Sequence, residues 1–126
     1  MMDSEVTNVG CSERAHDLLK QFKEQELFAE MLDGYRFAIS YAAALGVVPP
    51  EFEKRKTWLN IGSLDPDQLI RSAIEALYED QLTSTTVYRL AERLADWGVR
   101  EMYEQHTRGE LDFAALLKSV EDASIK

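Results

Sequence analysis

The sequence predicts an all-α fold: a compact single-domain bundle of about five to seven short helices, with a long irregular loop over residues 47–65 that can hold a short strand. Two observations support this. Apolar residues recur at helical spacing in several separate segments. A chain of 126 residues with 45% hydrophobic residues has the size and apolar content of one domain. We expect a flexible segment over residues 1–11, a helical domain over 12–120 and a frayed tail over 121–126.

The first expected helix begins after Ser12, a residue type that caps helix N-termini. Its apolar face consists of Ala15, Leu18, Leu19 and Phe22. This stripe stops at the polar residues 23–26, and the next stripe, over residues 27–35, starts in a different phase, so we expect a bend or a short break between them. Residues 35–45 are apolar on nearly every side and end at Gly46, which predicts the most buried helix of the fold.

Pro49 and Pro50 prevent the helix from continuing. Residues 57–62 alternate weakly in polarity and predict a short strand or an ordered loop, with Trp58 or Ile61 as its anchor in the core. The run Asp65-Pro66-Asp67 favours the start of a helix, because it offers a cap, a proline at the first helical position and an early carboxylate. The apolar face of that helix consists of Leu69, Ile70, Ala73, Ile74 and Leu77.

Residues 80–86 read as a connection that ends in a Ser/Thr cap. The helix that follows has an apolar face consisting of Val87, Leu90, Ala91, Leu94 and Trp97. We expect Gly98 to end it and Gly109 to close one further helical stretch. Asp112 can cap a last short helix whose inward residues are Phe113, Leu116, Leu117 and Val120.

The charge of the chain limits its partners. A formal net charge of −9 argues against general nucleic-acid binding and against an acidic membrane surface, since both need an excess of Lys and Arg. Acidity is concentrated in the second half: residues 1–63 carry 7 basic and 10 acidic side chains, and residues 64–126 carry 7 and 13. That half is therefore the better surface for a basic protein partner.

The cysteine content and the hydropathy of the sequence predict the cellular compartment of the protein. The single cysteine, Cys11, excludes an intrachain disulfide and a zinc site built from several cysteines, which fits a reducing environment. The sequence has no run of about 18 apolar residues of the kind that a membrane-spanning helix needs. We therefore expect a cytoplasmic protein that does not act at a membrane.

The sequence offers no catalytic constellation. His16 and His106 have no partner at the i, i+4 spacing of helix-borne metal sites, and Cys11 has no nearby His to activate it. Two carboxylate pairs at i, i+4, Glu26 with Glu30 and Glu75 with Glu79, can hold a cation or simply form solvated helix faces. We expect a protein that is not an enzyme, without catalytic, cofactor-binding or metal-binding residues. The alternative is a metal-dependent enzyme that uses these helix carboxylates.

One basic cluster stands out, Lys54-Arg55-Lys56, close to an aromatic residue, Trp58. Three positive charges next to an aromatic ring on an irregular loop can contact a phosphate backbone or an acidic partner surface. The alternative is a solvated loop whose charges are offset by the neighbouring glutamates. Lys54, Arg55, Lys56 and Trp58 are therefore the candidate contact residues of the sequence.

A family resemblance rests on the order of four segments. These are FAISYAAALG at residues 37–46, the proline-containing basic loop with Arg55, the Asp-led helix over residues 67–77, and RLAERLADWGVREM at residues 89–102. In this order the chain resembles, over residues 27–117, the small proteins associated with bacterial Dnd (DNA phosphorothioate modification) and phage-defence gene clusters. It departs from them in its long loop over residues 56–65 and in Trp97 before the glycine.

The resemblance implies a non-catalytic accessory or regulatory protein that contacts a larger protein subunit of the same system, and it brings no catalytic residue. The alternative function is a regulator that contacts nucleic acid through the Lys54-Arg55-Lys56 loop, together with Arg36 or other arginines. Self-association into a homo-oligomer is a further expectation. The aromatics at expected element ends, Trp58, Trp97, Tyr88 and Tyr103, either anchor such an interface or close the monomer core.

Overall fold

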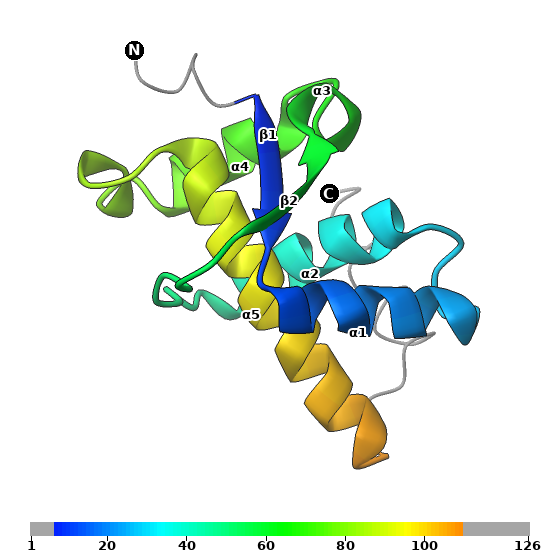
Figure 1. The fold of residues 1–126 in the computed structure, drawn as a ribbon. Helices are drawn as coiled ribbons and strands as arrows, with labels where there is room; N and C mark the ends of the chain where they lie inside the picture. Colours follow the sequence, from blue (N-terminus) through cyan, green and yellow to red (C-terminus); the bar gives the residue numbers. More distant parts are fainter. Residues whose placement is uncertain (1–6, 110–126) are drawn as a thin grey trace.

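The computed structural model of the protein describes residues 7–109. Their elements, in chain order, are β1 (Asn8–Cys11), α1 (Glu13–Glu24), α2 (Met31–Leu45), β2 (Lys56–Asn60), α3 (Ile61–Leu64), α4 (Leu69–Leu77), the 3₁₀ helix η2 (Gln81–Thr83) and α5 (Val87–Thr107). Most of this part is helical, and the two strands pair into one small antiparallel sheet (Figure 1). The predominantly helical class is thus confirmed, but the fold is not purely α.

Helix α5 runs through the middle of the molecule, and α2, β1, α1 and α4 pack against it (Figure 1). The expectation that Gly98 ends this helix is wrong, because α5 continues to Thr107. A Cβ atom at Gly98 would lie 2.4 Å from the carbonyl oxygen of Ala38 in α2. The glycine therefore allows two helices to cross at short distance instead of stopping one of them.

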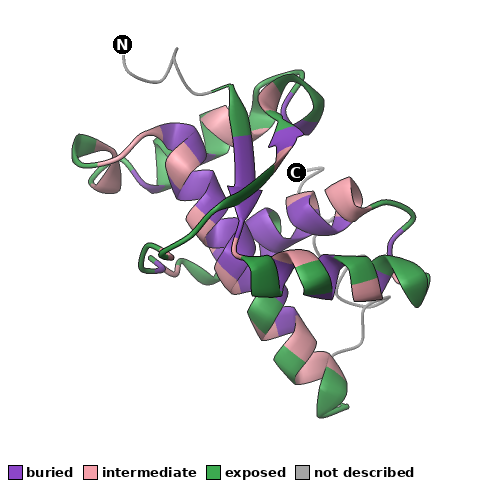
Figure 2. Cartoon of the chain, viewed as in Figure 1, coloured by how far each residue is buried: buried purple, intermediate pink, exposed green. Residues whose placement is uncertain are grey.

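Among the described elements, α5 supplies the largest number of buried residues (Figure 2), 11 of its 21. Helix α2 has 7 buried residues among its 15. Residues 35–45 include 6 of these 7, so the segment expected to be the most buried has as high a buried fraction as α5 but contributes fewer buried residues to the core. The physical reason is position: α2 covers one side of α5, whereas α5 is enclosed by elements on several sides.

Strand β1 corrects the expectation of a flexible segment over residues 1–11. Residues 8–11 pair with β2, and Val9 and Cys11 are fully buried. Four residues are too few to show a periodic pattern, and the partner strand lies far away in the sequence, so no local signal marks this strand.

Strand β2 confirms the expected short strand, and it contains a β-bulge. Leu59 lies opposite Val9 and Thr57 lies opposite Gly10, so Trp58 between them has no partner in β1. The strands approach so closely that a Cβ atom at Gly10 would lie 2.0 Å from the carbonyl oxygen of Lys56. A bulge redirects the side chain that it carries.

Several helix ends follow the sequence signals. The Ser12 hydroxyl accepts a hydrogen bond from the Ala15 amide at 3.1 Å, and Thr86 caps α5 in the same way. Gly46 ends α2 in the left-handed conformation, at a φ of 71°. The bend or short break expected after α1 is also confirmed, because α1 ends at Glu24 and α2 begins only at Met31.

Helix α4 begins later than expected, at Leu69, so Pro66 does not occupy its first position. Asp65 nevertheless caps it from a distance, since its carboxylate accepts hydrogen bonds from the amides of Ile70 and Arg71 at 2.9 and 3.0 Å. The apolar face of α4 is only partly covered. Ile74 is buried, whereas Leu69 is 67% and Leu77 62% exposed.

Two expectations concern residues that are not described. The last short helix after Asp112 and the frayed tail over residues 121–126 both lie outside residues 7–109. Within the described range, no helix is long and apolar enough to cross a membrane.

Candidate functional site

Two acidic side chains of α5 hold the backbone of the β1 region. The amide of Gly10 donates to Glu92 Oε2 at 2.8 Å, and the amide of Ser12 donates to Asp96 Oδ2 at 2.7 Å. The spacing matches, because four residues of helix rise about 6 Å and two residues of strand span about 6.6 Å. Both carboxylates are buried, at 1% exposure each.

Gly10 is also bonded by α2, through its carbonyl group. The Tyr35 hydroxyl donates to the carbonyl oxygen of Gly10 at 2.6 Å. Burial raises the pKa of Tyr35 well above its usual range, so its hydroxyl keeps the proton that it donates. Gly10 thus connects the sheet to both α2 and α5.

Glu92 also gathers two arginines. Its Oε2 atom accepts from Nε of Arg55 at 2.7 Å and from Nη1 of Arg89 at 2.9 Å. The two arginine side chains are 38% and 33% exposed, so each remains partly accessible to solvent while it bonds a buried carboxylate. A buried carboxylate needs such partners, since an uncompensated buried charge is costly.

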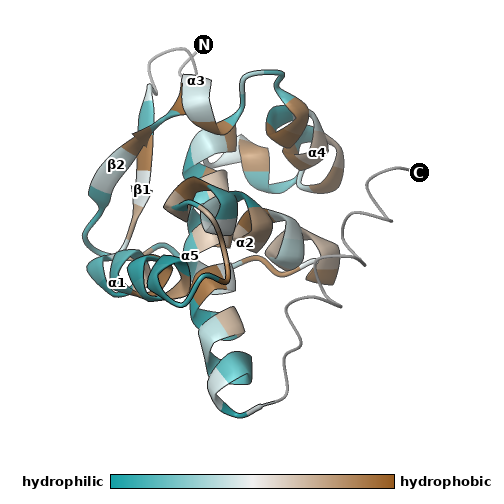
Figure 3. Ribbon diagram, turned by 90° about the vertical axis from the view of Figure 1, so that its right-hand side faces the viewer, coloured by the Kyte–Doolittle hydropathy of each residue, from teal (hydrophilic) through white to brown (hydrophobic). Residues whose placement is uncertain are grey.

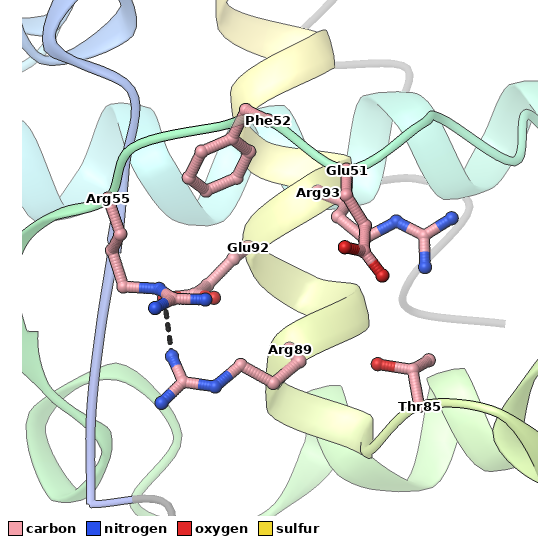
Figure 4. A pocket seen from close by; sticks show the side chains of 7 residues that line it. All are labelled: Glu51, Phe52, Arg55, Thr85, Arg89, Glu92 and Arg93. Carbon is pink, nitrogen blue, oxygen red and sulfur yellow. Dashed lines mark hydrogen bonds and ion pairs between the residues drawn. The ribbon is translucent and has the colours of Figure 1, made fainter.

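These arginines border a pocket of about 290 Å³ between residues 49–55 and the start of α5 (Figure 4). Its lining consists of Glu51, Phe52, Arg55, Thr85, Arg89, Glu92 and Arg93. Arg93 donates with Nε and Nη2 to the carbonyl oxygen of Pro49, with the Nε bond at 2.9 Å, which fixes this guanidinium beside the pocket. Three positive charges thus meet two negative ones, in a chain that is acidic overall.

The four predicted contact residues do not form a single patch. Lys54 and Lys56 are exposed, whereas Arg55 bonds Glu92. The bulged Trp58 is half-buried, and its ring lies 5.5 Å from Tyr35 and 5.7 Å from His16 on α1. Of the four, only Arg55 lines the arginine pocket. Arg36 does not join it either, because Arg36 donates to the carbonyl oxygens of Ser63 and Leu64.

Sequence reasoning missed Glu92, Arg89 and Arg93, which complete the pocket. One signal was available, because Glu92 has apolar or aromatic residues at i−4, i+3 and i+7, the positions that share its helix face. Those three neighbours, Tyr88, Ala95 and Val99, are all buried. A carboxylate at such a position is buried and has to bind donors.

Cys11 and His16, the other candidate reactive side chains, are not arranged for catalysis in the described part of the chain. Cys11 is fully buried, and burial raises its pKa to about 12, so the nucleophilic thiolate is suppressed. Burial and the nearby charge of Lys56 lower the pKa of His16. Among residues 7–109, no group of three or more His, Cys, Asp or Glu side chains is placed to hold a metal ion.

The aromatic residues at element ends contact their own chain. Tyr88 is buried and donates to Asp65 at 2.8 Å. Trp97 stacks on Tyr41 with ring centres 6.3 Å apart, and the Arg14 guanidinium lies over the ring of Tyr103. Each of these residues therefore has an intramolecular role in the core or at its edge.

Comparisons with protein-family models, with curated proteins and with solved structures found no match to this chain. The resemblance to the Dnd-associated small proteins therefore stays a prediction.

Proposed function

We propose that the protein is a non-catalytic accessory or regulatory protein that acts by contact with a larger protein subunit, in a bacterial DNA-modification or phage-defence system. The resemblance over residues 27–117 is the reason for proposing this kind of system. The supporting structural observation is the apolar face of α4 that the rest of the described chain leaves uncovered.

This face consists of Leu69, Ala73 and Leu77, which are one turn apart and all exposed. In Figure 3, much of α4 has the brown colour of hydrophobic residues. An exposed apolar stripe of this kind costs solvation free energy in a free monomer and is typical of a protein–protein contact.

The surroundings of the stripe indicate the chemistry of the partner. Asp67, Glu75, Glu79 and Asp80 are exposed on and beside α4, and the half-buried Arg71 is the single basic residue between positions 65 and 80. Arg71 pairs with Glu75 at 3.3 Å, and Asp67, Glu79 and Asp80 are exposed to solvent. An apolar centre with an acidic rim fits a partner surface with apolar residues surrounded by Lys and Arg.

Co-purification from the native host, with the tagged protein at native expression, tests this function. We expect the wild type to bring down one larger protein, and the double variant Leu69→Ser/Leu77→Ser to lose most of it. Glu79→Lys should weaken capture in a salt-dependent way, whereas the matched charge reversal Glu24→Lys on α1 should not. Isolation of the wild type without any partner, or equal capture by the double variant, would refute the proposal.

A second candidate function is nucleic-acid contact through the Lys54-Arg55-Lys56 loop. It is favoured by the two exposed lysines on either side of Arg55, which itself lines the arginine pocket. Binding should weaken steeply with salt and disappear when the three residues are replaced by alanine. If no binding is detected even at low salt, this candidate is eliminated.

A further inference from the structure

We propose that the arginine pocket between residues 49–55 and α5 binds the phosphate group of a nucleotide. This goes beyond the protein contact proposed above and involves a different surface. Three features of the pocket favour such a ligand: its charge, the unused donors of its arginines and the aromatic ring at its rim.

The charge of the pocket favours an anion. Among the described residues that line the pocket, Arg55, Arg89 and Arg93 are accompanied by two carboxylates, those of Glu51 and Glu92. Arg55 and Arg89 share a single oxygen of Glu92, so two cationic groups are held close together by one negative charge. A phosphate placed against them would neutralise the excess charge and relieve the repulsion between the two guanidinium groups.

The donors are present and already oriented. A guanidinium carries five N–H donors. In the described part of the chain, Arg55 and Arg89 each donate one hydrogen bond, and Arg93 donates two to Pro49. Within residues 7–109, the remaining N–H groups of these three arginines have no acceptor and can bind a ligand, while the bonds already made hold each side chain in place. Such preorganisation lowers the entropic cost of binding.

The rest of the lining selects a nucleotide over a bare anion. Thr85 adds a hydroxyl, and Figure 4 shows the half-buried Phe52 ring near the arginines, on the opposite side of the pocket from Thr85. An aromatic ring is a stacking platform for a base. The volume of about 290 Å³ is close to the lower limit of small-molecule sites and suits a single nucleotide unit.

Glu51 provides the sharpest test of the electrostatic argument. It is exposed, it lines the pocket, and its charge opposes that of the incoming phosphate. Glu51→Gln should therefore tighten phosphate binding while leaving the fold intact. A purely structural role of the arginines would predict no such gain.

The experiment is calorimetric titration of the full chain with AMP, with inorganic phosphate and with a short single-stranded oligonucleotide. We expect saturable binding of AMP, weakened about tenfold by Arg89→Gln, and strengthened by Glu51→Gln. Arg100→Gln, which removes an exposed arginine that pairs with Asp96 outside the pocket, should leave affinity unchanged. Phe52→Ala should weaken AMP but not inorganic phosphate.

Comparing the three ligands also distinguishes a free nucleotide from a nucleic-acid strand as the source of the phosphate. Tighter binding of the oligonucleotide than of AMP identifies a strand as the natural ligand, and the reverse identifies a free nucleotide. The proposal is overturned if AMP and the oligonucleotide both fail to bind saturably, or if Arg89→Gln and Arg100→Gln have equal effects. It is also overturned if inorganic phosphate binds as tightly as AMP. Since Glu51→Gln leaves the Glu92 contacts in place, unchanged affinity in that variant contradicts the proposal without ambiguity from misfolding.

Discussion

The amide of Gly10 donates a hydrogen bond to the carboxylate of Glu92, a residue 82 positions further along the chain. The oxygen that accepts it also accepts from Arg55 and Arg89. One buried atom therefore joins the first strand, the loop before the second strand and the central helix. The fold of the sheet and the shape of the arginine pocket consequently depend on the same side chain.

Replacing Glu92 by alanine should destabilise the protein strongly. The change removes the acceptor of three donors and leaves a buried amide and two guanidinium groups without their partner, which costs about 3 kcal/mol of unfolding free energy. Urea unfolding measures this cost. Glu104→Ala on the exposed side of α5 is the control and should change stability by less than about 0.5 kcal/mol; equal effects of the two variants would mean that the contacts of Glu92 contribute nothing.

The basic run offers a comparison between adjacent residues. Arg55 bonds a buried carboxylate, whereas its neighbour Lys54 is exposed. Arg55→Ala should therefore lower the unfolding free energy by about 1.5 kcal/mol, and Lys54→Ala by less than about 0.5 kcal/mol. Urea unfolding of the two variants measures both changes in unfolding free energy. If Lys54→Ala proves to be the more destabilising variant, the assignment of Arg55 as the structural member of the run is wrong.

Gly98→Ala tests the close crossing of α2 and α5. Alanine favours a helix over glycine by about 1 kcal/mol, yet its Cβ would lie 2.4 Å from the Ala38 carbonyl oxygen. We expect a net loss of about 2 kcal/mol, because the two helices have to move apart. Ser72→Ala, on the exposed part of α4, introduces alanine into a helix without a clash and should be neutral or slightly stabilising. A stabilised Gly98→Ala protein would contradict the crossing.

Cys11 should resist modification until the protein unfolds. Its side chain is fully buried and its pKa is about 12, so neither access nor thiolate is available at mildly alkaline pH. Alkylation followed by mass spectrometry should show no labelling of the native protein and complete labelling in denaturant. Rapid labelling under native conditions would show that the first strand opens.

The same thiol predicts a pH dependence of stability. Its pKa is 9.0 when unfolded and about 12 when folded, so the folded state disfavours the thiolate. The contribution of Cys11 should be constant below pH 9.0 and should be lost progressively between 9.0 and about 12. Comparing the slopes of unfolding free energy against pH for the wild type and Cys11→Ala isolates this group; identical slopes would contradict the shift.

The parts of the fold that could be predicted are those with local causes. The first helix has its cap at Ser12 and its apolar stripe within one short segment, so its sequence contains nearly all the information needed. Strand β1 could not be predicted, because its backbone bonds go to β2 and to Glu92. The prediction that Gly98 ends a helix failed for a related reason. Glycine disfavours a helix only weakly, and here the packing of α2 against α5 outweighs that preference.

The candidate site divides in the same way. The basic run of residues 54–56 identifies Arg55 as a candidate contact residue. The neighbouring sequence does not indicate that its guanidinium bonds Glu92 on α5. Arg89 and Arg93 were missed because they lie in a helix that also carries Glu92 and Asp96, where their charges look balanced. Only the folded chain shows which of these charges are buried and which face the pocket.

Hydrogen exchange of the protein alone and in complex with its co-purified partner tests the proposed protein contact most directly. The proposal predicts that amides of residues 69–77 and of their flanking turns gain protection in the complex, while those of residues 49–58 exchange as before. Protection confined to residues 49–58, with α4 unchanged, would contradict the proposed contact through α4.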